Sequence, residues 1–474
     1  MTKQTTLISD DHIYAAPLKS FFVEMLTRDI DLEDAILDLL DNCIDGILRS
    51  KKDVTGTNPY QGYKADIRIE PNLFSILDNC GGIPWSLHDY AFRMGRSSAR
   101  AETLGSVGYY GIGMKRAIFK MGKNCRIKTK NEKHQYEVVI SETWLKDEFS
   151  DHAWDLPVTN IEWSGKDGTI IEIRDLYDGI AKQFNENAEK FTSNLEKIIS
   201  TQYAIILEKG FEVKINNKIV KPRAITLAFD SHTAEVNKIE PYVYKAESSD
   251  GVKVFLTVGF TRPIPSQNEL DDEKESAKYS SVDAGWTVIC NDRVVVYCNR
   301  DELTGWGEAG VPRYHNQFIA ISGIVEFWSQ DSGKLPTTTT KRGLNASSPI
   351  FLQVKNKMRD GMKIFTSYTN KWKGKELESK QQINKGERLS FNEIKQKSTN
   401  LKMHPTPRSI LSGNQYLPKL PVPKVIEPAI KRIAFSKDVK EVRKVATYLG
   451  DPNMEPNDVG ERCFDIIHEE AKKI

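Results

Sequence analysis

Three short polar segments follow one another near the start of this chain, and their order constrains the fold more than any other feature. The first is an acidic stretch from Asp38 to Asp45, the second a turn from Leu77 to Pro84, and the third a glycine-rich stretch from Gly105 to Lys115. Taken singly, they are typical of a solvated helix face, a plain hairpin and a flexible linker.

The acidic stretch is predicted to be helical, with its polar side chains on one face. Asp38, Asn42 and Asp45 stand at positions i, i+4 and i+7 and therefore share that face. The amide oxygen of Asn42 suits a hard cation such as Mg²⁺. A carboxylate one turn earlier, at Asp38, is placed to orient or deprotonate an attacking water. The open alternative is a solvated face of an amphipathic helix.

The turn follows an apolar strand and begins with Asp78. A carboxylate there can accept a hydrogen bond from the exocyclic amine of adenine, and Gly81 and Gly82 allow the backbone to approach a base closely. A plain hairpin is the alternative, since Asp and Gly are common turn residues.

The glycine-rich stretch predicts a phosphate cradle. Gly105, Gly108, Gly111 and Gly113 precede a helix that carries Lys115 in its first turn, where exposed backbone N–H groups bind anions. The spacing matches neither the GxxxxGK[ST] loop nor a dinucleotide fingerprint in a βαβ unit. A flexible linker is the alternative.

The rest of the chain predicts an α+β protein with four parts. Helix is expected over 13–46, with a break near 29–31, and again over 185–207, with strands between them. A hairpin signal, Asn216-Asn217, opens a second unit, which further strands follow and a helix over 351–370 closes. The expected parts are residues 1–205, 206–370, a basic proline-containing linker over 371–424, and a small helical domain over 425–474.

Bulk composition sets the remaining limits. The net charge is +2, which argues neither for nor against nucleic acid. The six cysteines are scattered without a CxxC pair, so neither a zinc site nor a disulfide framework is predicted. No apolar run approaches the ~20 residues needed to cross a bilayer, and we expect a cytoplasmic protein without membrane contact.

Together the three segments resemble the nucleotide pocket of the GHKL ATPases, which include the DNA gyrase B subunit, the ninety-kilodalton heat-shock chaperones, histidine kinases and MutL. The string GSVGYYGIGMKRAIFKMGKN, over 105–124, is particularly similar to the Microrchidia (MORC) branch. The resemblance implies a Bergerat-type α/β sandwich over the first part and a transducer-like second domain. It also implies ATP and Mg²⁺ as cofactors.

Site residues follow from the same resemblance. Asn42 would bind Mg²⁺, Asp78 would hold adenine, and Gly82 would face the base. Thr169, which follows Gly168 at the head of a strand, would lie near the nucleotide. The remaining nucleotide-binding positions implied are Asp45, Gly108, Tyr110, Gly111, Ile112, Gly113, Met114 and Lys115.

In the transducer domain of this superfamily, a loop lysine reaches back to the γ-phosphate. Lys341 is the candidate here, with Arg342 as its rival and a solvated basic loop as the alternative.

The sequence departs from the family at two positions. Many members carry glutamate where this chain has Asp38, which is one methylene shorter, and a misplacement of about 1 Å can cost on the order of 10²-fold in rate. We therefore expect slow turnover. Cys80 stands where the family's turn has its first glycine, and cysteine is tolerated there if its φ is negative.

The resemblance implies an ATP-dependent clamp that closes as a homodimer, through residues 14–31, and slowly hydrolyses ATP. DNA is one candidate client, because the stretch 355–408 holds 14 Lys and Arg against 5 Asp and Glu. A solvated linker also explains that stretch. A chaperone-like ATPase acting on protein clients and a non-hydrolysing scaffold stay open. Chromosome maintenance, anti-phage defence and an effector protein partner all fit.

Overall fold

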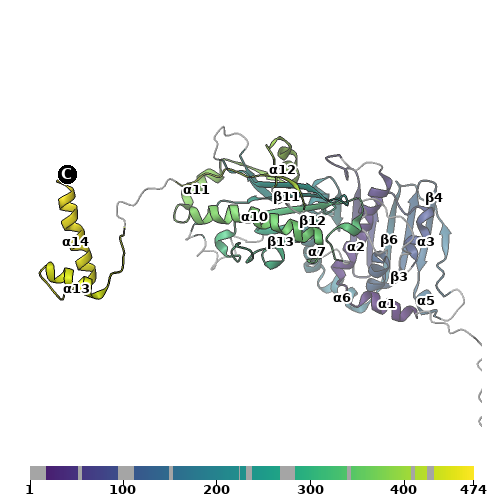
Figure 1. The fold of residues 1–474 in the computed structure, drawn as a ribbon. Coiled ribbons are helices and arrows are strands. Elements are labelled where there is room, and N and C mark those ends of the chain that lie inside the picture. Colours follow the sequence, from purple (N-terminus) through teal and green to yellow (C-terminus); the bar gives the residue numbers. More distant parts are fainter. Residues whose placement is uncertain are drawn as a thin grey trace, which may run out of the picture. The chain divides into compact units, whose positions relative to one another are not determined.

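The computed structural model describes residues 18–473, apart from the segments 52–55, 94–111, 149–152, 224, 231–237, 267–268, 270–282, 339–342, 407–410 and 424–431. By its contacts the chain separates into two compact units, Met1–Pro423 and Lys424–Ile474. The helices of the described part (Figure 1) are α1 Lys19–Thr27, α2 Leu32–Ser50, α3 His88–Phe92, α4 Gly113–Met121, α5 Glu142–Lys146, α6 Asp178–Glu186, α7 Ala188–Gln202, α8 Ala204–Glu208, α10 Pro349–Lys371, α11 Glu376–Ile383, α12 Phe391–Lys397, α13 Val439–Tyr448 and α14 Pro456–Ala471.

The strands fall into two large sheets and one small ribbon. Their bounds are β1 Lys64–Glu70, β2 Leu73–Asp78, β3 Gly122–Asn131, β4 His134–Ile140, β5 Val158–Asn160, β6 Gly168–Leu176, β7 Glu212–Ile215, β8 Lys218–Ile219, β9 Thr226–Phe229, β10 Tyr242–Glu247, β11 Lys253–Phe260, β12 Gly285–Cys290, β13 Arg293–Asn299, β14 Ile321–Trp328, β15 Glu387–Ser390, β16 His404–Pro405 and β17 Gly413–Tyr416.

The first sheet has eight strands in the order β5-β4-β3-β6-β2-β1-β7-β8. Its neighbours are antiparallel except β1 and β7, which run parallel. Helices α2, α4 and α7 share one hydrophobic core with this sheet. The sheet therefore supplies a fixed platform for the three segments that the sequence singled out.

Helix α2 forms where the apolar spacing predicts it. Ile36, Leu40, Ile44 and Ile47 are fully buried against the sheet, which is the face that residues three and four apart create. Glu33 and Asp34 occupy the first turn, where carboxylates stabilise the positive end of the helix. The expected break before this helix is confirmed, since residues 28–31 separate α1 from α2.

The second sheet has seven strands in the order β13-β12-β14-β11-β10-β17-β16. Alternate residues of its central strands face opposite ways. Leu256 and Val258 of β11 share a core with α10, while Phe255 packs against Phe391 of α12 with ring centroids 5.5 Å apart. The sheet is therefore covered on both faces, which fits the burial of successive residues along β11. The predicted α+β class is confirmed.

Two interpretations of the sequence are wrong. The hairpin β7–β8 was expected to open the second unit, but it forms the edge of the first sheet, beside β1. The stretch 371–424 was expected to be a linker, but its described part contains α11, β15, α12, β16 and β17. Trp372, Ile383 and Ile394 from this stretch are buried in the cores of the second sheet.

The unit Lys424–Ile474 contains α13 and α14, as the helical spacing predicts. Ala446 and Val459 are its buried apolar side chains. Among the residues that the structure describes, no helix combines the length and the apolar character needed to cross a membrane.

Candidate functional site

The acidic face of α2 is divided between solvent and the interior. Asn42 is exposed, whereas Asp38 and Asp45 are buried. The Oδ2 atom of Asp38 accepts hydrogen bonds from Arg116 of α4, at 2.5 Å from Nη2 and 3.2 Å from Nε. Because Arg116 neutralises this carboxylate, Asp38 is not a free base in this conformation.

Helix α4 begins at Gly113, as predicted, and its first turn packs against α2. A Cβ atom added to Gly113 would lie 3.3 Å from Cβ of Asp38, so the first turn of α4 borders the acidic face. Ile112 and Met114 are half-buried beside it. The preceding glycines Gly105, Gly108 and Gly111, and Tyr110, lie outside the described residues.

Lys115, in the first turn of α4, connects this helix to α3. Its side chain is buried, and Nζ donates to the carbonyl oxygen of Ala91 in α3 at 2.8 Å. This bond ties α4 to α3, the two elements on either side of residues 94–111.

The turn after β2 has the backbone that its sequence predicts. Gly81 and Gly82 have φ of +95° and +65°, while Cys80 is not among the residues with positive φ, so cysteine is tolerated there without strain. The carboxylate of Asp78 accepts a 2.7 Å hydrogen bond from the Cys80 amide. Helix α2 approaches this turn closely, since a Cβ on Gly46 would lie 2.4 Å from the Cys80 carbonyl oxygen.

The opposite wall of the site comes from β3 and β6. Thr129 Oγ1 accepts a 2.8 Å hydrogen bond from the amide of Ile83 and lies 3.2 Å from Oγ1 of Thr169. A Cβ on Gly82 would lie 2.0 Å from the Lys130 carbonyl oxygen, and one on Gly168 would lie 2.1 Å from that of Asp78. The two glycines therefore permit contacts that no other residue type allows.

These contacts bring Asp78, Gly82 and Thr169 together, and α2 packs on the same turn through Gly46. These three are candidates from the sequence, whereas Arg116, Gly46 and Thr129 are contacts of this region that the sequence did not single out. Nothing local in the sequence marks Arg116 as the partner of a residue 78 positions earlier. Lys341 and Arg342 lie outside the described residues.

Burial controls the ionisation of the site. Desolvation raises the pKa of Asp78 to about 6, although the backbone amides of Cys80 and Thr169 lower it in part. At neutral pH the carboxylate is consequently ionised and available as an acceptor, and it titrates within the physiological range.

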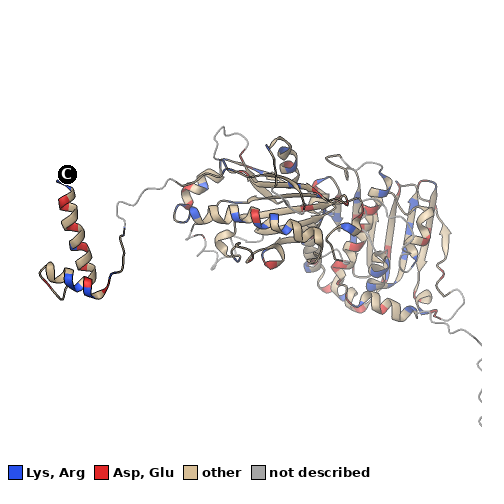
Figure 2. Cartoon of the chain, viewed as in Figure 1, with Lys and Arg blue, Asp and Glu red and all other residues tan. Residues whose placement is uncertain are grey.

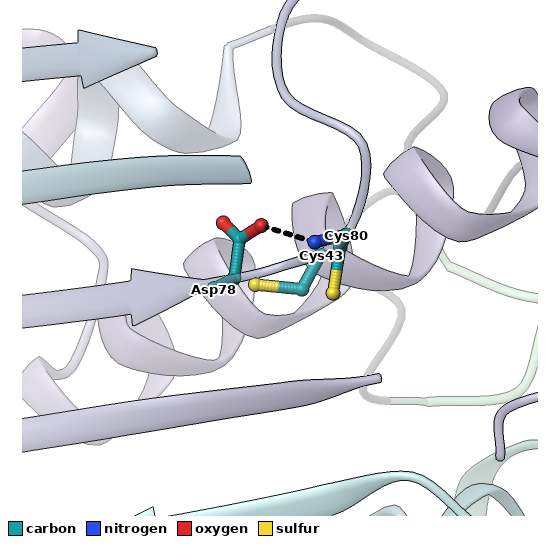
Figure 3. A group of neighbouring side chains, drawn as sticks. All are labelled: Cys43, Asp78 and Cys80. Carbon is teal, nitrogen blue, oxygen red and sulfur yellow. Dashed lines mark hydrogen bonds between the residues drawn. The ribbon is translucent and has the colours of Figure 1, made fainter. Parts of the chain in front are cut away.

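Two thiols lie beside this carboxylate. Ligand atoms of Cys43, Asp78 and Cys80 are all within 4.8 Å of one another, and Figure 3 shows both cysteines next to the aspartate. The hydrogen bond to Cys80 and burial raise the pKa of Cys43, and burial raises that of Cys80. Protonated thiols are poor metal ligands, so the two cysteines are better explained as uncharged neighbours of the Asp78 carboxylate.

The comparison with protein families agrees with this geometry. Residues 30–168 match the family model of histidine kinase-, DNA gyrase B-, and HSP90-like ATPases. No curated protein matches the chain. The matched range spans α2, the turn after β2, α4 and the head of β6, and it supports the GHKL ATPase superfamily for this part of the chain. Domains of this class bind ATP, typically with Mg²⁺.

Proposed function

We propose that the chain is an ATP-dependent molecular switch that binds ATP–Mg²⁺ between α2, the turn after β2 and the head of β6. The observation that carries this proposal is the partly buried carboxyl group of Asp78 at a turn packed against Thr129 and Thr169. Such an acceptor fits the exocyclic amine of adenine. Gly82 and Thr169 border the same space.

Mg²⁺ binding is proposed for the carboxamide of Asn42. This side chain is exposed on α2, one turn after Asp38, and its neutral oxygen is a ligand of the kind that hard cations accept. Bound Mg²⁺ would neutralise phosphate charge. We also assign Asp45 to the nucleotide site, as a buried residue of the same helix.

Slow hydrolysis is proposed with Asp38 as the group that orients water, and it requires Arg116 to leave Asp38. The observed ion pair favours a second candidate, a switch that binds ATP without turning it over. In that case Arg116 keeps Asp38 neutralised and the response is conformational only. A lysine from the second domain, Lys341, stays our proposed γ-phosphate contact.

We also propose that ATP closes a homodimer through the N-terminal helix. Leu18, Phe21 and Met25 lie on one side of α1 and are exposed by 46%, 60% and 56%. The helix is anchored by Lys19, which is buried and donates to the Trp144 carbonyl oxygen at 2.5 Å. An anchored helix with an outward apolar stripe supports contact with a second protein surface.

The client is proposed to be DNA or a partner protein, as in a MORC-like clamp. Support for DNA is weaker than the sequence suggests, because six cations of the basic stretch pair with carboxylates: Lys355, Lys357, Arg359, Lys380, Lys395 and Lys397. Figure 2 shows mainly basic residues along α10, and Asp360 is the one acidic residue of this helix. Roles in genome maintenance or anti-phage defence, and a chaperone-like action on protein clients, rest on the resemblance alone.

Calorimetric titration with ATP–Mg²⁺ tests the binding proposal, followed by phosphate release with and without duplex DNA. We expect Asn42→Ala to abolish Mg²⁺-dependent binding. Glu33→Gln, on the same helix but bonded to Asn194 of α7, is the matched control. Phosphate release that Asp38→Ala abolishes supports the hydrolysing switch. Binding without release supports the second candidate, and no binding by the unaltered protein refutes both.

A further inference from the structure

The hairpin β12–β13 of the second sheet reaches the elements around the nucleotide site. Its turn residues, Asn291 and Asp292, have φ of +47° and +65°, the backbone of a tight two-residue turn. The Asp292 carboxylate accepts from Tyr60, before β1, at 2.9 Å and from Lys209, after α8, at 2.6 Å. The tip of this hairpin is therefore fixed to the part of the chain that carries the first sheet.

The next residue, Arg293, contacts α2 itself. Its Nε donates to Oδ1 of Asp41 at 3.1 Å, and its Nη1 donates to the Gln202 carbonyl oxygen at 3.0 Å. The guanidinium also lies 4.0 Å from the ring centroid of Tyr203, whose hydroxyl donates to the same Asp41 oxygen at 2.6 Å. Arg293 and Asp41 are each 2% exposed, so neither charge can leave the other for solvent without opening the contact.

Two neighbouring aspartates of helix α2 are consequently each paired with an arginine from another element. Asp38 pairs with Arg116 of α4, next to the proposed nucleotide site, and Asp41, three residues later, pairs with Arg293 of β13. Residues three apart are neighbours on a helix. A shift of α2 that changes the pairing of Asp38 therefore moves Asp41, and with it the hairpin.

We propose that Arg293 is a positioning residue that couples nucleotide binding on α2 to the second sheet. This inference rests on the proposed function, and it names the route by which the occupied site changes the second sheet. Arg293 does not touch the nucleotide; it holds Asp41, and through Asp41 the helix that carries Asp38 and Asn42. When ATP binds, the second sheet would then move together with the hairpin β12–β13.

The alternative is a buried ion pair that only stabilises the fold, and hydrogen–deuterium exchange of the full chain separates the two. Arg293→Met alone leaves Asp41 buried without its cation and risks unfolding. The informative variant is therefore Arg293→Met combined with Asp41→Asn, which removes both charges. Arg223→Met is the matched control, because Arg223 pairs with Asp283 at the base of the same hairpin and not with α2.

At saturating ATP–Mg²⁺, we expect the unaltered protein to show slower exchange in α2 and in the turn after β2, and altered exchange in β12–β14. The double variant should keep the first effect and lose the second, whereas Arg223→Met should keep both. An ATP effect on β12–β14 that persists in the double variant, or that is absent from the unaltered protein despite binding, overturns the inference. Absence of any ATP binding refutes instead the proposed function on which it rests.

Discussion

Replacing Asp78 by asparagine should stabilise the nucleotide-free protein at neutral pH. Burial raises the pKa of this carboxyl from an ordinary 3.8 to about 6. The unfolded chain therefore releases the proton at lower pH than the folded chain does. Folding stability is lost as pH rises from about 4 to 6, and the loss is complete above pH 6. One pKa unit corresponds to about 1.4 kcal/mol, so the full penalty is at most about 3 kcal/mol.

Asparagine carries no charge and avoids this penalty, while its carbonyl oxygen can still accept from the Cys80 amide. The assay is urea unfolding of Asp78→Asn and of the unaltered protein, at intervals from pH 4 to pH 8. The difference in free energy of unfolding should move in favour of the variant by about 1–3 kcal/mol between pH 4 and pH 7, and should then level off.

A difference in free energy of unfolding that is the same at every pH would reflect packing or hydrogen bonding, and it carries no information on the pKa of Asp78. A difference that stays flat across this pH range would contradict this prediction, because the carboxyl of Asp78 would then titrate alike in both states. Asp66→Asn on the neighbouring strand β1, where the carboxylate is partly solvated, is the matched control. At pH 7.5 Asp78→Asn should also weaken ATP binding, since the ionised acceptor is gone.

Three further changes test the site. Gly82→Ala should lower the free energy of unfolding by about 3 kcal/mol or more in urea unfolding. The new Cβ would lie 2.0 Å from the Lys130 carbonyl oxygen, and residue 82 has a φ of +65°. Gly179→Ala is the control and should not destabilise the fold, because nothing lies within 4 Å of that position. Arg116→Gln should lower the free energy of unfolding by about 3 kcal/mol, because Asp38 would stay buried without the Arg116 cation. An unchanged urea midpoint would contradict this. Lys115→Met should speed hydrogen–deuterium exchange in α3 and α4 by removing the bond between these two helices, and an unchanged exchange rate would contradict this.

The parts of the site that could be predicted are those with a local signal. The acidic face of α2 follows from helical spacing, and the start of α4 from Gly113 before an apolar repeat. The turn backbone follows from Gly81-Gly82, since glycine supplies the positive φ. In each case the determining residues lie within one or two turns of one another, so the sequence itself carries the information.

The parts that could not be predicted depend on partners far apart in the chain. In the sequence Arg116 is one more cation beside Lys115, and only the fold brings it into contact with Asp38. The sequence over 371–424 predicts a linker because its lysines and prolines outnumber widely spaced buried residues such as Trp372 and Ile394. Several of those lysines pair with carboxylates from other elements, as Lys395 does with Glu326. Charge counting along the sequence cannot register that neutralisation.

The course of the chain after α10 has a practical consequence. Strand β17 pairs along β10, so residues 413–416 cap an edge of the second sheet that would otherwise present free N–H and C=O groups. A shortened protein that stops near residue 371 would uncover that edge and leave Phe255 without its partner Phe391. Such a fragment should self-associate through strand pairing, so dimerisation of fragments trimmed there would report an artificial contact rather than the proposed contact through α1.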